Sequence, residues 1–121
     1  MKYLLILILS FWIVLLSNFA KSQNEQDIVE WFRSLKTPNQ IGNLPAGISC
    51  CDQSDCKRRN ITFINNKLHA FIEEVGSWVE IPAESEITDK EVLQKRPFFQ
   101  AVVCYVPGRG IICYVPGNTG G

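Results

Sequence analysis

The chain opens with a nearly unbroken apolar run over residues 3–16, preceded by the single charge of Lys2. The small residues of Ala20-Lys21-Ser22 follow it, and this order is typical of an export signal with its cleavage site. The run is shorter than the ~20 residues that comfortably span a bilayer, so retention as an uncleaved anchor is the lesser alternative. We expect residues 1–22 to be a signal peptide, and residues 23–121 to form one periplasmic or secreted domain without a stable membrane span.

A second hydrophobic pattern, over residues 24–36, has the spacing of one helix face. Ile28, Trp31, Phe32 and Leu35 stand at positions i, i+3, i+4 and i+7, which predicts an amphipathic helix. Thr37-Pro38 is expected to end it.

The pattern changes to period two between residues 60 and 82, which predicts a strand meander. A tight turn at Asn65-Asn66 pairs Phe63 with Leu68, and a second turn at Val75-Gly76 pairs Ile72 with Val79 and Ala70 with Ile81. Both turns place the same residues on one face: Ile61, Phe63, Leu68, Ala70, Ile72, Val79 and Ile81. The other face is mixed and partly wet.

The last strands, residues 99–106 and 110–115, are expected to form a hairpin with a two-residue turn at Gly108-Arg109. Its two faces are both apolar, which predicts the most buried hairpin of the domain. One face groups Cys104 with Ile111 and Cys113, and the other groups Ile112 with the tyrosines. Thr88 and Glu91 have the spacing of a capping box, which predicts a short helix over residues 89–95.

These elements predict an α+β fold. We expect the N-terminal helix to pack on a small antiparallel sheet, or a partly closed barrel, of about five strands, with residues 116–121 as a flexible tail. Without the expected signal the chain carries ten basic and twelve acidic residues. This balance does not favour nucleic acid as a partner.

Five cysteines, an odd number, lie in the expected domain: Cys50, Cys51, Cys56, Cys104 and Cys113. In an oxidising compartment two disulfides use four of them. One scheme bridges Cys104 to Cys113, which lie opposite each other in the hairpin. The scheme that we favour joins two cysteines of the 50–56 cluster to the hairpin, because longer loops give more stabilisation. Since adjacent cysteines cannot easily both reach one hairpin, Cys50 or Cys51 should stay free.

Metal and redox chemistry are alternatives for the same cysteines. Their spacing does not match a structural zinc site, and a Cys-x-x-Cys redox motif is missing. We therefore expect no metal and no cofactor. If Cys51 is the free thiol, the charge of Asp52 should raise its pKa and make it a slow nucleophile.

Five other side chains are possible ligand contacts. The basic run Lys57-Arg58-Arg59 could bind an anionic group, although such runs are usually solvated. His69 and Trp78 share the wetter face of the meander. No triad can be read around His69, so no catalytic residue is assigned.

The chain resembles a group of small exported bacterial proteins of uncharacterised function, mostly proteobacterial. The matching elements are Cys50-Cys51 with Cys56, Trp78-Val79-Glu80-Ile81-Pro82, and Ala101-Val102-Val103-Cys104 with Cys113. The resemblance covers residues 31–116 and implies a periplasmic or secreted location without adding a catalytic residue.

The function that we expect is a non-catalytic binding or accessory module for an unknown protein or small-molecule ligand. A thiol-redox protein or small secreted enzyme is one alternative, and a protease-inhibitor-like interaction protein is another. An exposed aromatic patch favours the binding module, whereas a pocket with perturbed titratable groups favours an enzyme.

Overall fold

The computed structural model describes residues 2–118, with side chains for residues 3–12, 25–52 and 54–118. The chain divides into two compact units, Met1–Glu30 and Trp31–Gly121. The expected cleavage site falls where side chains are not described, and the end of the expected flexible tail lies outside the described residues.

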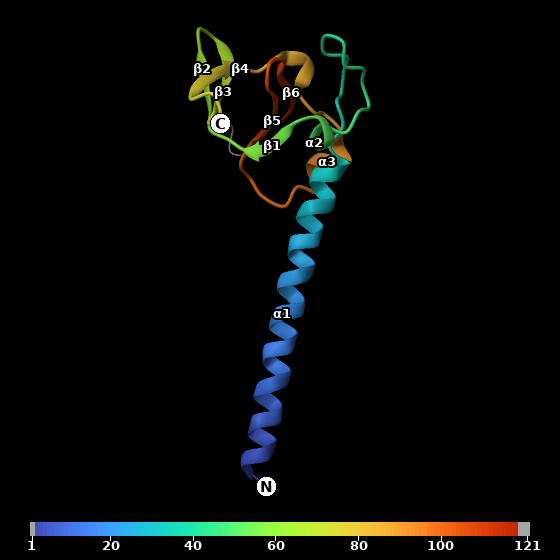
Figure 1. Ribbon diagram of the computed structural model, residues 1–121, viewed down its shortest axis with the longest axis vertical. Helices are drawn as coiled ribbons and strands as arrows, with labels where there is room; N and C mark the ends of the chain where they lie inside the picture. Colours follow the sequence, from blue (N-terminus) through green and yellow to red (C-terminus); the bar gives the residue numbers. More distant parts are fainter. Residues whose placement is uncertain (1, 119–121) are drawn as a thin grey trace. The chain divides into compact units, whose positions relative to one another are not determined.

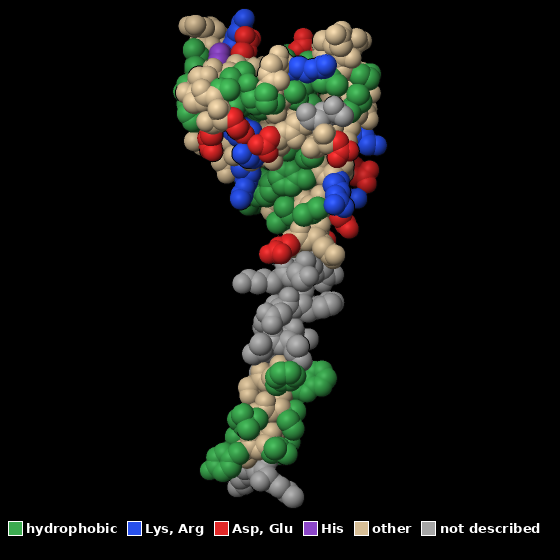
Figure 2. All heavy atoms as spheres, in the orientation of Figure 1, with side chains coloured by type: hydrophobic (Ala, Val, Ile, Leu, Met, Phe, Trp, Pro, Cys, Tyr) green, Lys and Arg blue, Asp and Glu red, His purple; other side chains and the backbone are tan. Residues whose placement is uncertain are grey.

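Helix α1 runs from Lys2 to Ser34 as one element (Figure 1). The separate helix expected over residues 24–36 was therefore wrong at its start, and it ends two residues early. The physical reason is that residues 2–34 contain neither Gly nor Pro, so nothing in this stretch breaks a helix. In the first unit, the large apolar side chains between Tyr3 and Trp12 are exposed (Figure 2). Among the described residues, we find no helix with the length and apolarity needed to cross a membrane.

The second unit contains two antiparallel sheets of three strands each (Figure 1). One has the order β1-β5-β6 and the other the order β2-β3-β4. The strands are β1 (Asp55–Arg58), β2 (Ile61–Ile64), β3 (Lys67–Ile72), β4 (Ser77–Glu80), β5 (Val102–Val106) and β6 (Gly110–Val115). The short helix α2 (Cys50–Gln53) precedes β1, and the short helices η1 (Ala83–Ser85) and α3 (Lys90–Gln94) lie between β4 and β5.

The α+β class is thus confirmed, but its finer description was wrong. Six strands form two separate sheets, and within residues 2–118 neither sheet closes into a barrel.

The sheet β1-β5-β6 lies between two hydrophobic clusters, which explains why its hairpin is apolar on both faces. One cluster joins this sheet to the end of α1 and the following loop, and contains Trp31, Leu35, Leu44, Cys50, Ile87, Val102, Cys104, Ile112, Cys113 and Val115. The other joins it to the meander, and contains Ala70, Ile72, Ile81, Ala101, Val103, Tyr105, Ile111 and Tyr114. The expectation that this hairpin is the most buried is confirmed, since residues 111–115 are all buried.

The meander has the expected faces but not the expected second register. Asn65 and Asn66 both have positive φ angles, and Phe63 pairs with Leu68 as predicted. At the second turn, however, Ala70 pairs with Val79, two residues away from the expected partner. A two-residue loop would have placed β-branched Val75 at positive φ, whereas the loop used spans residues 73–76 and has positive φ at Gly76. Because the shift is even, every side chain keeps its predicted face.

The last hairpin contains a β-bulge that was not predicted from the sequence. Cys104 pairs with Cys113 as expected, but the register shifts after Cys104, and Val106 pairs with Gly110. The loop therefore has three residues, and Gly110 has a φ of +97°, the combination of a three-residue hairpin loop with a bulge. The shift exchanges two side chains, so that Ile111 faces the meander and Ile112 faces α1.

Helix α3 begins one residue later than the predicted capping box implied. Asp89, not Thr88, is the N-cap, and its side chain accepts a hydrogen bond from the Glu91 backbone N–H at 2.9 Å. Aspartate satisfies a free N–H of the first turn in the same way as threonine would.

Candidate functional site

Trp78, one of the possible ligand contacts, lies on the outer face of the sheet β2-β3-β4. Trp78 pairs with Phe71 across β4 and β3, and their rings meet edge to face with centroids 5.4 Å apart. Trp78 keeps 42% of its surface exposed. An aromatic ring held by a neighbour loses little freedom when it contacts a ligand, which is why such rings are common at binding surfaces.

His69 lies on the same outer face as Trp78. It pairs with Thr62 on one side and Glu80 on the other, and its Nδ1 lies 2.9 Å from the Lys67 carbonyl oxygen. Lys67 and Glu80 form an exposed ion pair of 3.5 Å at the margin of this face. The outer face is thus an aromatic centre with a polar rim, and we call Thr62, His69, Phe71, Trp78 and Glu80 the outer-face patch.

Ser77, a candidate nucleophile for His69, does not share its face. Ser77 pairs with Ile72, so the alternation of the strand directs it to the opposite face from His69. His69 and Ser77 therefore do not form a catalytic pair.

Arg59, one of the possible ligand contacts, is instead buried and makes its hydrogen bonds within the protein. Its side chain is 1% exposed, and its two terminal nitrogens bind both carboxylate oxygens of Glu74 at 2.8 and 3.1 Å. It also donates to the carbonyls of Val103 and Asp55, each at 3.3 Å. Arg59 therefore fastens the loop between β3 and β4 to the sheet β1-β5-β6.

This ion pair has a clear effect on Glu74. The bidentate hydrogen bonds from Arg59 stabilise the carboxylate, and they hold the pKa of Glu74 far below its usual range. The sequence reading missed Glu74, because the partner of a buried arginine fifteen residues away is decided by the packing of two sheets.

The other two basic residues of the run lie at the surface. Lys57 forms exposed ion pairs with Asp55 at 2.9 Å and Glu74 at 3.1 Å. The Arg58 guanidinium lies 4.9 Å from the centroid of the Phe98 ring, a cation–π geometry. The basic run does not gather into one anion site, because its three side chains have three different surroundings.

The disulfide bonds join the 50–56 cysteine cluster to the hairpin of β5 and β6. Cys50 is bonded to Cys113 and Cys56 to Cys104, while Cys51 is a free thiol. The two bonds close loops with sequence separations of 63 and 48 residues. They fix α2 and β1 to the centre of the domain.

The free thiol of Cys51 is half-buried, and its Sγ donates to the Phe32 carbonyl at 3.2 Å. Burial, and then the charges of Asp52 and Asp55, raise the pKa of Cys51 to about 11. The effect of Asp52 was anticipated, but burial is the larger cause. Since the thiolate is the nucleophile, this thiol reacts slowly at neutral pH.

Sulfur atoms lie close together on the hairpin face that packs against the end of α1. The Sγ atoms of Cys51, Cys56 and Cys104 lie within 4.8 Å of one another, and so do those of Cys50, Cys104 and Cys113. Metal ligation needs thiolates, and in each of these groups the disulfide bonds leave at most one cysteine able to become one.

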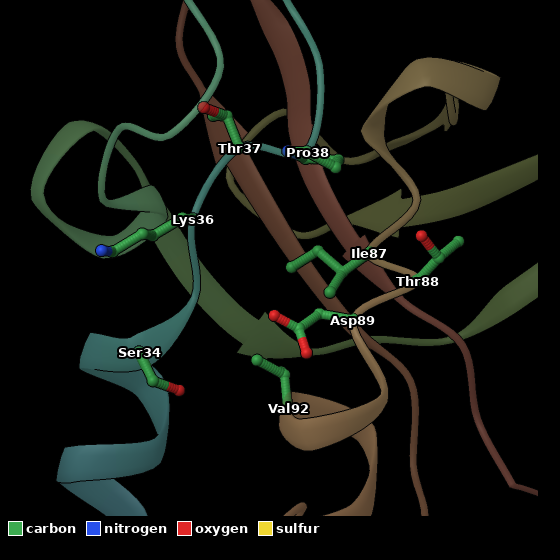
Figure 3. A pocket seen from close by; sticks show the side chains of 8 residues that line it. All are labelled: Ser34, Lys36, Thr37, Pro38, Ile87, Thr88, Asp89 and Val92. Carbon is green, nitrogen blue, oxygen red and sulfur yellow. The ribbon is translucent and has the colours of Figure 1, made fainter.

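An open hollow of about 400 Å³ lies between the end of α1 and the segment that leads into α3 (Figure 3). Its lining residues are Ser34, Lys36, Thr37, Pro38, Ile87, Thr88, Asp89 and Val92. Lys36 extends away from Ile87 and Asp89 (Figure 3), and Asp89 already caps α3. This hollow could not be predicted from sequence patterns, because its lining residues come from two separate segments.

No family model, curated protein or solved structure matches this chain.

Proposed function

We propose that the protein is an exported, disulfide-stabilised binding module that contacts its ligand through the outer-face patch. The observation that carries the proposal is Trp78, an exposed aromatic side chain braced by Phe71 and lying beside His69. The part of the ring that stays in contact with water adds little to folding, but it supplies contact area for a partner.

The electrostatics favour binding over catalysis. Among the described residues, the groups with shifted pKa values are Cys51, Lys57, Glu74, Arg96 and Tyr114. None of them belongs to the outer-face patch, and those of Lys57 and Glu74 arise from an ion-pair network with Arg59 and Asp55. An enzyme site would be expected to gather such groups in one concave place.

A thiol-redox function is the weaker alternative, because the free thiol is slow. The raised pKa of Cys51 leaves few thiolates at neutral pH. Export is supported by two disulfides, which persist in oxidising compartments, together with the signal-like sequence at residues 1–22.

Binding is tested by applying the labelled full chain to an array of immobilised oligosaccharides and peptides. We expect Trp78→Ala to weaken binding to whichever probes the wild type retains by about tenfold or more, as for aromatic residues at the centre of interfaces. Phe63→Ala is the matched control, because Phe63 is 67% exposed on the opposite face of the same sheet. Equal binding by wild type and Trp78→Ala would contradict the assignment of this face.

Export is tested by the intact mass of the protein recovered outside the cytoplasm. We expect a chain that begins at Gln23. Recovery of the uncleaved chain in a membrane fraction would contradict the signal-peptide proposal.

A further inference from the structure

The free thiol and one of the two disulfides form a contiguous cluster. The Sγ atoms of Cys51, Cys56 and Cys104 lie within 4.8 Å of one another, and Cys56 is bonded to Cys104. A thiolate exchanges with a disulfide when it can approach one of the two sulfur atoms. The Cys51 Sγ lies beside both sulfur atoms of this bond.

From this geometry we propose that Cys51 exchanges with the Cys56–Cys104 disulfide, so that the covalent link to β5 moves from β1 to α2. The Cys51 thiol first gives its proton to a base in solution. Its sulfur then forms a bond to the Cys104 Sγ, the Cys56–Cys104 bond breaks, and Cys56 leaves with the electron pair as a thiolate that solvent protonates. One disulfide and one thiol are present before and after, so the step needs neither an oxidant nor a reductant.

The surroundings of the two disulfide sulfurs decide which one is attacked. Cys104 is fully buried, whereas Cys56 is partly exposed. Release of a thiolate at Cys104 would place a charge in the hydrophobic cluster, which is costly. Release at Cys56 places it near water, with the Ser54 hydroxyl 3.7 Å away.

The exchange changes how β1 is held. This strand lies at the edge of the sheet β1-β5-β6, and Cys56 is paired with Cys104 within it. After the exchange, the Cys50–Cys113 and Cys51–Cys104 bonds both start from adjacent cysteines of α2. The sequence argued against such a pairing, but the structure already holds the Cys51 Sγ within 4.8 Å of the Cys104 Sγ. Strand β1 is then held by its hydrogen bonds and side-chain contacts. The exchange is therefore a switch between a fastened and a releasable edge strand, and it does not depend on the binding proposal.

The rate of this switch depends on the ionisation of Cys51. The groups that act on the thiol are the Phe32 carbonyl on α1, the carboxylate of Asp52 on α2 and that of Asp55 on β1. With a pKa raised to about 11, the thiolate fraction grows about tenfold for each pH unit between neutral and about pH 10. The starting pairing is thus long-lived at neutral pH and exchanges in alkali.

The test follows the thiols of the oxidised full chain after incubation at pH values between about 7 and 10. Each sample is acidified and treated with a maleimide, and then cut before Asp52 and Asp55, which separates Cys56 from the Cys50-Cys51 pair. We expect the label to move from Cys51 to Cys56, a Cys51–Cys104 linked peptide to appear, and the rate to rise about tenfold per pH unit.

Matched variants separate this path from ordinary scrambling. Cys51→Ser and Cys51→Ala should show no labelling of Cys56, and Asp52→Asn should exchange faster than wild type at the same pH. The wild-type rate should be unchanged by tenfold dilution. The proposal is overturned by label that stays on Cys51 at every pH, by a Cys51–Cys56 link with a free Cys104, or by Cys56 labelling in the Cys51 variants.

Discussion

The two sheets of the second unit have similar sizes but are stabilised in different ways. The sheet β1-β5-β6 is covered on both faces and holds three of the four bonded cysteines. The sheet β2-β3-β4 contains no cysteine, buries one face, and leaves Trp78 and Phe71 on the other. Cross-links and burial thus fix the centre of the domain, and the sheet that lacks them keeps a face free for contact.

The two sheets are joined by packing and by one ion pair whose arginine is buried. Ala70 and Ile72 on β3 pack against Val103 and Ile111. Arg59 then binds Glu74 of the meander together with the Val103 carbonyl. Differences between the sheets can be measured by changing one of these features at a time.

The largest expected difference in the free energy of unfolding is between Trp31→Ala and Trp78→Ala. Trp31 is 5% exposed and its Nε1–H donates to the Val92 carbonyl at 2.9 Å, so its loss should lower the free energy of unfolding by about 3–5 kcal/mol. Trp78→Ala removes a half-exposed ring and should cost about 1 kcal/mol. Chemical denaturation of both full-length variants measures this, and equal losses would contradict the contrast between the sheets.

The disulfide to Cys113 should have the next largest effect. Replacing Cys50 and Cys113 together by Ala removes a bridge with a sequence separation of 63 residues, and should lower the free energy of unfolding by about 2–4 kcal/mol. Cys51→Ala is the control and should change it by less than about 1 kcal/mol. A loss in the control as large as in the double variant would show that packing around α2, rather than the bridge, is responsible.

A smaller effect is expected for the ion pair that joins the sheets. Glu74→Gln leaves the Arg59 charge without its counter-charge, and should lower the free energy of unfolding by about 2 kcal/mol, because the Glu74 carboxylate is partly solvated. Glu73→Gln, at the exposed neighbouring position, should have almost no effect. Similar losses for both variants would mean that the loop itself, and not the ion pair, is sensitive.

The same ion pair predicts a dependence on pH. The pKa of Glu74 is lowered by folding, so its contribution is complete above about pH 4.5, the range of unfolded glutamate, and is lost as the pH falls further toward the folded value. In thermal unfolding, the stability of the wild type should therefore fall more steeply below about pH 4.5 than that of Glu74→Gln. If the stabilities of the two proteins fell in parallel as the pH is lowered, this role of Glu74 would be contradicted.

Much of the fold follows from local features of the sequence, namely alternation along a strand and turn residues. Period-two alternation and the Asn65-Asn66 turn determined the first hairpin, and the two-sided apolar pattern of residues 111–115 determined that this strand is buried on both faces. The odd cysteine count indicated one free thiol, and the alternation placed His69 and Trp78 on the wetter face. These features depend on neighbours in sequence or on one strand pair.

The tertiary structure decided what depends on distant segments. The bulge after Cys104 exchanges the faces of Ile111 and Ile112, so that each joins a different hydrophobic cluster. The pairing of cysteines 48 and 63 residues apart depends on where β1 and α2 meet the hairpin, and the contact of Arg59 with Glu74 depends on the packing of the two sheets. Sequence alone indicates which side a residue faces where the alternation along a strand is unbroken, which it is not at Ile111 and Ile112; what the residue faces there is set by the packing of the whole unit.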